Sequence, residues 1–193
     1  MKNTTKKNCL FTALALICSA AISQAQFGSS GGAVVIGGGY LEKPGTAYGF
    51  GQIRGTVYED HSVAHSVFLD ILGHQDGAVI ELKNGNLVRG DISFVNITAN
   101  YELEAKLSGA LSFYAGGGAG IELVSIDDRF DDVLDSDANF VAQVFCGFRA
   151  HYPSGVVVQA GARYIFRDDF QLLGDQFITE DSVAFEASIG FRF

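Results

Sequence analysis

A strict two-residue alternation between apolar and small or polar side chains constrains this chain more than any other feature. It is clearest at the end of the sequence, where residues 182–193 read SVAFEASIGFRF. Every second residue there is apolar, and the residues between them are small or charged. Because successive side chains of a β-strand point to opposite faces, this pattern predicts a strand with one apolar face and one polar face.

The same alternation recurs along the chain and predicts eight strands. A tilted strand needs about 9–11 residues to cross the hydrocarbon core of a bilayer, whereas strands of ordinary globular proteins peak at about 5–6 residues. The alternating segments are about 9 to 14 residues long, which favours a membrane barrel. The expected strands are 33–41, 46–58, 62–72, a fourth segment whose lower part is 95–103, 111–123, 140–152, 156–167 and 182–193.

The links between the expected strands alternate in length. Short links follow the second, fourth and sixth strands, at 59–61, 104–108 and 153–155. Longer links follow the third, fifth and seventh strands, at 74–85, 127–138 and 168–181. The first link, 42–45, is short and departs from the pattern. Short turns at one end and long loops at the other are typical of outer-membrane barrels, so we expect both termini on the periplasmic side.

Alternation alone does not say which face points outward, because a soluble eight-stranded barrel can enclose a ligand with its apolar face. Two observations favour the apolar face outside. Acids and arginines are nearly balanced on the polar face, and aromatic residues such as Tyr101 and Phe166 fall near strand ends, as interfacial girdles do. Unpaired buried charge is costly, so we expect the interior charges to pair and plug the barrel, leaving at most a narrow water path. The expected interior charges are Arg54, Asp70, Glu102, Glu122, Arg149, Arg163, Arg167, Glu186 and Arg192.

The first 25 residues have the composition of a cleaved export signal. Lys2, Lys6 and Lys7 precede an apolar stretch at 10–22, which is shorter than the roughly 20 residues that span a bilayer. Small residues at Ser23 and Ala25 then fit a signal-peptidase site. We therefore assign residues 1–25 to a signal peptide and residues 26–193 to an outer-membrane β-barrel domain. A lipoprotein signal at Cys18 is the alternative, and the bulky Ile17 before it opposes that interpretation.

Removal of the signal leaves a strongly acidic chain. The signal contains three of the 13 basic residues and none of the 22 acidic ones, so 10 basic residues remain against 22, a net charge of −12. Nucleic-acid binding requires a basic footprint, so we expect none. Cys146 is the one cysteine after residue 25, which excludes an intramolecular disulfide in the mature chain.

Three features together resemble the small eight-stranded outer-membrane β-barrels of Gram-negative bacteria, of the outer-membrane protein A and opacity-protein type. They are the signal at 1–25, the strand YAGGGAGIEL at 114–123 and the terminal SIGFRF. The resemblance covers the whole mature chain as a pattern. It implies an all-β fold, an eight-stranded antiparallel up-and-down transmembrane β-barrel, without a peptidoglycan-binding domain. It also implies an insertion signal for the barrel-assembly machinery at Phe185, Ile189, Phe191 and Phe193.

Residue types that serve catalysis, phosphate binding or metal binding occur without the patterns those sites need. The glycine runs at 37–39 and 116–120 lack the Lys-Ser/Thr ending of a phosphate loop, and sheet curvature and room for large inward neighbours explain them. His61 and His65 share a face but have no third metal ligand nearby. No histidine is followed two residues later by serine, as it is in lipid A deacylases. We expect no catalytic residue, no cofactor and no metal site.

Two of the expected long loops are strongly acidic. Residues 127–137 read DDRFDDVLDSD, and the link at 168–181 adds five acids, so these loops hold half of the 22 carboxylates. The central Gly and closing Glu of an EF-hand loop are missing. A solvated outer loop is the simplest interpretation, and binding of divalent cations that bridge to lipopolysaccharide is the alternative. The aspartates of the first loop are Asp127, Asp128, Asp131, Asp132, Asp135 and Asp137.

These observations favour a structural or surface-interaction role in the outer membrane, either envelope integrity or adhesion through the acidic loops. The expected partners are outer-membrane lipid, lipopolysaccharide and a host or cell-surface molecule. A small porin-like channel or carrier is the first alternative. A lipid-modifying or proteolytic barrel with catalytic residues in its loops is the second.

Overall fold

The chain forms ten β-strands in the part that the structure describes. The computed structural model describes residues 31–81, 87–126, 138–168, 170–172, 175–177 and 180–193. The predicted signal peptide and all six aspartates of the predicted loop at 127–137 lie outside the described residues. Within these limits, no helix is long and apolar enough to cross a membrane.

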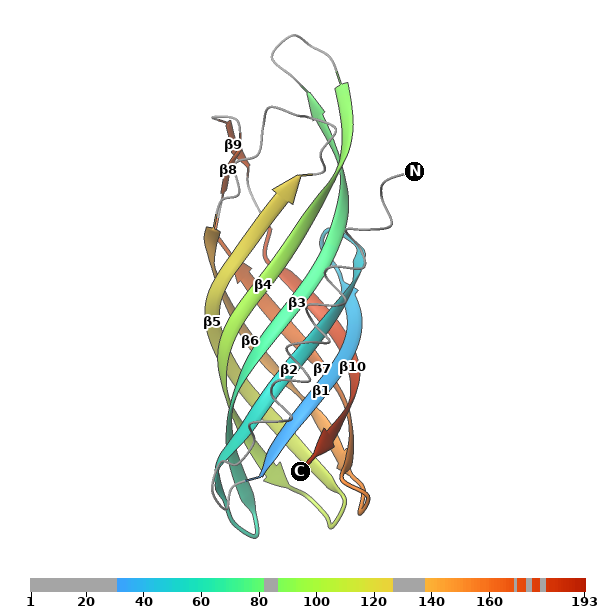
Figure 1. Cartoon of the computed structure of the whole chain (residues 1–193), viewed down its shortest axis with the longest axis vertical. Coiled ribbons are helices and arrows are strands. Elements are labelled where there is room, and N and C mark those ends of the chain that lie inside the picture. Colours follow the sequence, from blue (N-terminus) through green and yellow to red (C-terminus); the bar gives the residue numbers. More distant parts are fainter. Residues whose placement is uncertain (1–30, 82–86, 127–137, 169, 173–174, 178–179) are drawn as a thin grey trace.

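Eight of the strands close into a barrel in which every neighbouring pair is antiparallel (Figure 1). The order around the barrel follows the chain, and the last strand returns to the first. The predicted fold class is thereby confirmed. The barrel strands are β1 (Gly32–Leu41), β2 (Thr46–Glu59), β3 (Val63–Glu81), β4 (Leu87–Lys106), β5 (Leu111–Ile126), β6 (Ala138–His151), β7 (Val156–Arg167) and β10 (Ser182–Arg192).

Closure of the barrel depends on the pairing of β1 with β10. Their register runs from Ala33 opposite Arg192 to Leu41 opposite Ala184. Beyond the last strand residue, Phe193 and Gly32 exchange two backbone hydrogen bonds of 2.9 Å. The sheet therefore has no free edge at this seam, which is what a bilayer requires of a spanning sheet.

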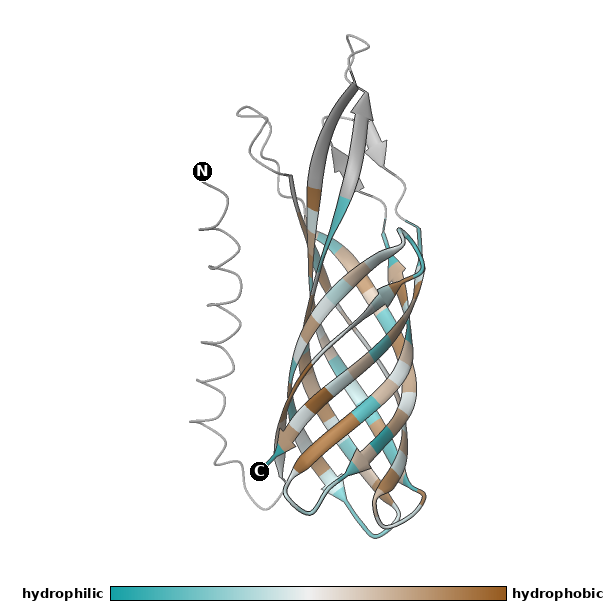
Figure 2. Cartoon of the chain, turned by 90° about the vertical axis from the view of Figure 1, so that its right-hand side faces the viewer, coloured by the Kyte–Doolittle hydropathy of each residue, from teal (hydrophilic) through white to brown (hydrophobic). Residues whose placement is uncertain are grey.

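The apolar face of each strand points away from the barrel axis. On β10, Phe185, Ile189 and Phe191 are more than half exposed, while Glu186 and Ser188 between them are buried. The same alternation of apolar and polar residues runs around the barrel wall (Figure 2). The hydrophobic surface thus forms the outer wall, as it must in a transmembrane barrel, and the polar face forms the interior.

Inward glycines make room for the aromatic side chains of the interior. Phe145 is paired across strands with Gly116, and a Cβ added at Gly116 would lie 2.7 Å from the Phe145 ring. Gly37 stands in the same relation to Phe50, with a separation of 2.6 Å. Neither glycine can therefore be enlarged without moving an aromatic ring.

The strands meet in short turns at one end of the barrel, called here the short-turn end. At the other, the long-loop end, the β1–β2 turn is also short, but the links from β5 to β6 and from β7 to β10 are longer. In Figure 1 the short-turn end is at the bottom, beside the C-terminus. The turn between β2 and β3 is shaped by Asp60, whose carboxylate accepts hydrogen bonds from the backbone N–H groups of Ser62 (2.7 Å) and Val63 (2.8 Å). Gly155, with a φ of 83°, provides the left-handed residue of the turn between β6 and β7.

Two predicted loops are in fact partly strand. The predicted link at 74–85 is wrong, because β3 and β4 continue their pairing from Gln75 opposite Ser93 to Glu81 opposite Leu87. The predicted link at 168–181 contains a small hairpin of β8 (Phe170–Leu172) and β9 (Asp175–Phe177). Backbone hydrogen bonds hold these extensions together, and they lack the apolar alternation that a strand facing lipid must show. The strands were predicted from that alternation, so the extensions were not recognised as strands.

Candidate functional site

A chain of buried ion pairs crosses the barrel interior toward the short-turn end. Glu102 of β4, with no exposed surface, lies between two arginines from different sides of the barrel. Arg54 donates to it with two bonds of 2.8 and 2.7 Å, and Arg149 with two bonds of 2.8 and 3.1 Å. Two bidentate contacts on one carboxylate fix both guanidinium planes, and a buried carboxylate needs such partners.

The chain of ion pairs continues from Arg149 along the same wall. Arg149 also contacts Glu104, and Glu104 in turn pairs with Nε2 of His151 at 2.6 Å. Both guanidinium groups also lie over aromatic rings, with Arg54 4.1 Å from the Phe68 centroid and Arg149 4.7 Å from that of Tyr114. The aromatic faces supply further attraction for the cations in a site removed from water.

A second cluster lies deeper, around Arg163 of β7. Its guanidinium contacts Asp70 of β3 and pairs with Glu186 of β10 at 3.0 Å. Gln143 accepts a further hydrogen bond of 2.8 Å from Arg163, and the Tyr48 hydroxyl donates to Glu186 at 2.9 Å. One arginine therefore holds two carboxylates from strands that are not neighbours in the barrel.

The long-loop end of the interior holds a third ion pair and the buried polar side chains of His74, Asn96 and Ser182 beside its apolar residues. Arg167 and Glu122 lie 3.2 Å apart, and the side chains of both are almost fully buried. Eight buried side chains from six consecutive strands of the barrel form one hydrophobic cluster, which runs from Val35 near the short-turn end to the long-loop end. They are Val35, Leu41, Tyr48, Phe50, Leu72, Val141, Ile165 and Ala184. This cluster adjoins the Arg163 group, since the Arg163 guanidinium lies 5.4 Å from the Phe50 ring centroid and the Tyr48 hydroxyl donates to Glu186.

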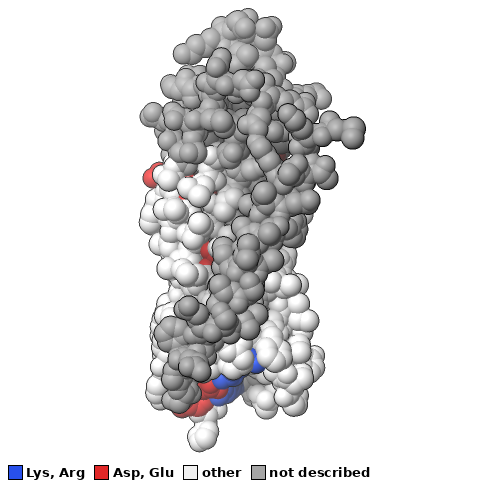
Figure 3. Space-filling model, viewed as in Figure 1, with Lys and Arg blue, Asp and Glu red and all other residues white. Residues whose placement is uncertain are grey.

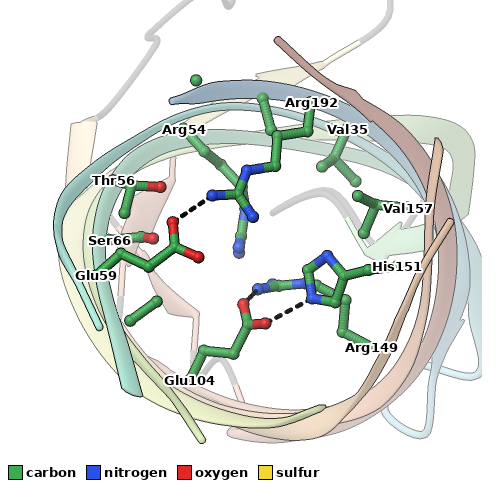
Figure 4. A pocket seen from close by; sticks show the side chains of 13 residues that line it. Val35, Arg54, Thr56, Glu59, Ser66, Glu104, Arg149, His151, Val157 and Arg192 are labelled. Atoms are coloured by element: carbon green, nitrogen blue, oxygen red, sulfur yellow. Dashed lines mark hydrogen bonds and ion pairs between the residues drawn. The ribbon is translucent and has the colours of Figure 1, made fainter. Parts of the chain in front are cut away.

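The lumen widens toward the short-turn end into a cavity of about 40 Å³ (Figure 4). Arg54, Arg149 and Arg192 line it together with Glu104 and His151. In Figure 4 the Glu104–His151 pair and the Glu59–Arg192 pair face each other across the opening. The cavity, called here the vestibule, is thus a recess lined by charged and apolar side chains, and the described interior above it is packed.

Charged side chains also gather at the rim around the vestibule. Glu59 of β2 contacts Arg192 of β10 and pairs with Lys106 of β4 at 2.8 Å. In Figure 3 most of the coloured charged atoms on the described wall lie at this end. Three strands, including the one that closes the barrel, are therefore linked at the rim by one carboxylate.

The structure places the residues selected from the sequence as follows. Eight of the nine expected interior charges have side chains inside the barrel and form the ion pairs described above. Arg192 differs, because it lies at the rim with 38% of its side chain exposed. The four residues of the expected insertion signal form a row on the outer face of β10 and just beyond it, with Phe193 43% exposed.

Other members of these networks were not selected from the sequence. Glu104 was assigned to a turn, although it lies inside β4 and is 6% exposed. His151 and Glu59 stand at strand ends, where alternation fades. The signal that could have identified Glu104 is its spacing, two residues from Glu102 on the same face.

Among the described residues, no three His, Cys, Asp or Glu side chains come together as metal ligands would. His65, which the sequence places on one face with His61, lies beside Tyr101 on the outer wall, with Nδ1 hydrogen-bonded to the Tyr101 hydroxyl.

The fold is shared with solved outer-membrane barrels of low sequence identity. Neisserial surface protein A matches with a TM-score of 0.55 and 14% identity, over 85% of this chain and 96% of that one. The N-terminal β-barrel domain of Pseudomonas aeruginosa OprF matches with a TM-score of 0.52 and 11% identity, over 84% and 97%.

Ail, the attachment invasion locus protein of Yersinia pestis, in complex with sucrose octasulfate, matches with a TM-score of 0.51 and 15% identity, over 85% of this chain and 97% of that one. No protein-family model matches the chain, and no curated protein does. The closed barrel, its apolar outer wall and these structural matches agree, and the chain therefore has the fold of the small eight-stranded outer-membrane β-barrels.

Proposed function

We propose that the protein is an integral outer-membrane barrel that acts by surface contact, through the hairpin of β3 and β4 that projects from its long-loop end. The apolar wall supports insertion in a bilayer. The short turns would face the periplasm and the long connections the exterior, as in other barrels of this kind. The signal peptide expected at 1–25 would carry the chain to that membrane.

The observation that carries the proposal is the height of this hairpin. In Figure 1, β3 and β4 rise above the other barrel strands. The pairing of β2 with β3 reaches no further than His74, and that of β4 with β5 begins at Ile92. Beyond these points the hairpin has no strand neighbour on either side within the described residues.

Free strand edges offer unpaired backbone donors and acceptors to another chain. An extended segment of a partner can add to such an edge through main-chain hydrogen bonds. The packed interior also supports a role in surface contact, because a lumen filled by ion pairs and apolar side chains is unsuited to a solute pathway. Envelope lipid and lipopolysaccharide surround such a barrel, and the proposal assigns it no catalytic role.

The test shortens the hairpin and leaves the barrel intact. Residues 78–90 are replaced by Asn-Gly, which forms a tight hairpin turn. Escherichia coli cells displaying either form are then compared for adhesion to a cultured epithelial monolayer and for adhesion to one another. We expect the trimmed barrel to assemble in equal amount and to lose the adhesion that the full barrel confers. Equal adhesion by both forms, or none above that of cells without the barrel, would contradict the proposal.

A further inference from the structure

We propose that the vestibule at the short-turn end is a binding site for a small oxyanion, a phosphate or a carboxylate. The proposed orientation of the barrel turns this site toward the periplasm, on the opposite side of the membrane from the projecting hairpin. The site is separate from the surface contact proposed above and does not depend on it.

The first argument is the arrangement of donors. The contact of Arg192 with Glu59 uses Nη2, and the described residues give Nε and Nη1 no acceptor. His151 uses Nε2 for Glu104 and Ser112. Its Nδ1 has no described partner and donates a hydrogen bond when both ring nitrogens are protonated. In Figure 4 both groups lie at the opening of the lumen, on strands that are separated by β7. Donors that converge on a recess from two strands suit an oxyanion, which accepts several hydrogen bonds at once.

The second argument is charge. Four cations and three carboxylates make up the ion pairs at and above the rim: Arg54, Arg149, Arg192 and Lys106 with Glu59, Glu102 and Glu104. Asp60 turns its carboxylate into its own turn, toward Ser62 and Val63. With Asp60 counted, these groups hold as many carboxylates as lysine and arginine cations, although the chain as a whole is strongly acidic. An anion would therefore meet three arginines at this place rather than an excess of carboxylates.

The third argument is size and shape. One water molecule needs at least about 10–15 Å³ of cavity volume. The vestibule, with a volume of about 40 Å³, therefore accepts a group of a few atoms rather than a large solute. The hydroxyl groups of Thr56 and Ser66 belong to the same lining and offer further donors. The Arg54–Glu102–Arg149 group lies directly above, so a bound anion would stop at this level of the barrel.

The test titrates inorganic phosphate into the refolded full-length mature barrel and follows the ³¹P line width. A glucoside detergent is used, because detergents with phosphocholine head groups would compete. We expect saturable broadening for the unmodified barrel. Arg192→Gln and His151→Gln should each weaken the affinity about tenfold, as expected for loss of one charge-assisted hydrogen bond.

Lys43→Gln is the matched control, because Lys43 lies at the long-loop end and pairs with Glu180 on the surface. It should leave phosphate binding unchanged. Displacement of phosphate by acetate would identify a general oxyanion site, and failure of acetate to displace it a phosphate site. Broadening that does not saturate, or that is equal in all three variants, would overturn the proposal. If one vestibule variant does not refold, the other decides.

Discussion

Arg163 is the side chain on which the deeper interior cluster depends. It is 2% exposed and holds both Asp70 and Glu186. Replacing it with methionine would leave two carboxylates buried near each other without a counter-charge. We expect Arg163→Met to lower the free energy of unfolding by about 3–5 kcal/mol, the cost typical of breaking a buried ion pair on one side.

The measurement is urea-induced unfolding of the barrel in lipid vesicles, followed by far-UV circular dichroism, since the chain contains no Trp. Lys43→Met provides the control, because it removes a charge from a pair whose side chains are more than half exposed. Exposed pairs contribute little, so this variant should unfold like the parent. Equal unfolding of Arg163→Met and the parent would show that the cluster does not stabilise the barrel.

Gly116 tests whether the inward glycines are needed for packing. Its added Cβ would meet the Phe145 ring at 2.7 Å and also the backbone oxygen of Tyr101. We expect Gly116→Ala to destabilise the barrel by about 1–3 kcal/mol, as overpacking does. At the outward Gly49 the nearest atom would be 3.9 Å away, so Gly49→Ala should be as stable as the parent or more so. The same urea assay compares them, and equal loss in both variants would contradict this account.

At the residue scale, the sequence predicts which side of each strand a charge occupies but not its partner. Alternation alone identified Glu102 and Arg149 as inward residues. That Arg54 and Arg149 share Glu102 depends on the stagger of strands around the barrel, which no local pattern contains. Glu104 was missed because an acidic residue beside an expected turn resembles a solvated one.

At the scale of single elements, the β2–β3 turn makes a pH-dependent contribution to the stability of the fold. Backbone N–H groups of Ser62 and Val63 hold the pKa of Asp60 well below the ordinary value of about 3.9. A carboxylate with a lowered pKa in the folded state stabilises the fold above its unfolded pKa. That contribution decreases as the pH falls below about 4 toward the folded pKa.

We therefore expect Asp60→Ala to melt at a lower temperature than the parent at pH 7. The difference between them should shrink as the pH is lowered from 4 to 2. Thermal unfolding followed by circular dichroism at a series of pH values measures this. A difference that stays constant over the whole range would show that the Asp60 carboxylate is not its source.

The last strand is expected to carry the insertion signal, and Phe193 and Phe166 allow a matched comparison. Both are outward aromatic residues with nearly equal exposure, 43% and 44%. We expect Phe193→Ala to reduce the amount of folded barrel in the outer membrane of cells, with Phe166→Ala assembling normally. Both variants should refold alike in detergent. The readout is the band shift of folded barrel on unheated gels, and normal assembly of Phe193→Ala in cells would refute the signal.

Element boundaries show where sequence patterns stop being informative. The start of β7 at Val156 and the start of β10 at Ser182 were predicted correctly, because lipid on one face enforces alternation there. The upper part of β3 falls within the predicted link at 74–85, where His74, Gly77 and Asn84 resemble turn residues. Above the bilayer, no alternation is required of a hairpin, so its length could not be read from the pattern.

On the scale of the whole molecule, three layers of side chains follow one another along the lumen of the barrel. The rim and vestibule occupy the short-turn end, the arginine clusters lie above them, and the apolar cluster around Leu72 and Ile165 fills the end toward the long loops. Eight strands enclose a space that side chains can fill, and here they do. In the proposed function, this barrel would be the rigid support that holds the β3–β4 hairpin above the membrane.

Planar-bilayer conductance tests this closure most directly. The refolded barrel is inserted into a lipid bilayer in concentrated potassium chloride, beside a trimeric porin as positive control, and insertion is confirmed by protease protection. A lumen filled by paired charges and apolar side chains predicts a current that stays at the lipid baseline after insertion. Stable single-channel steps that scale with the number of inserted barrels would contradict the closed interior and favour a solute channel.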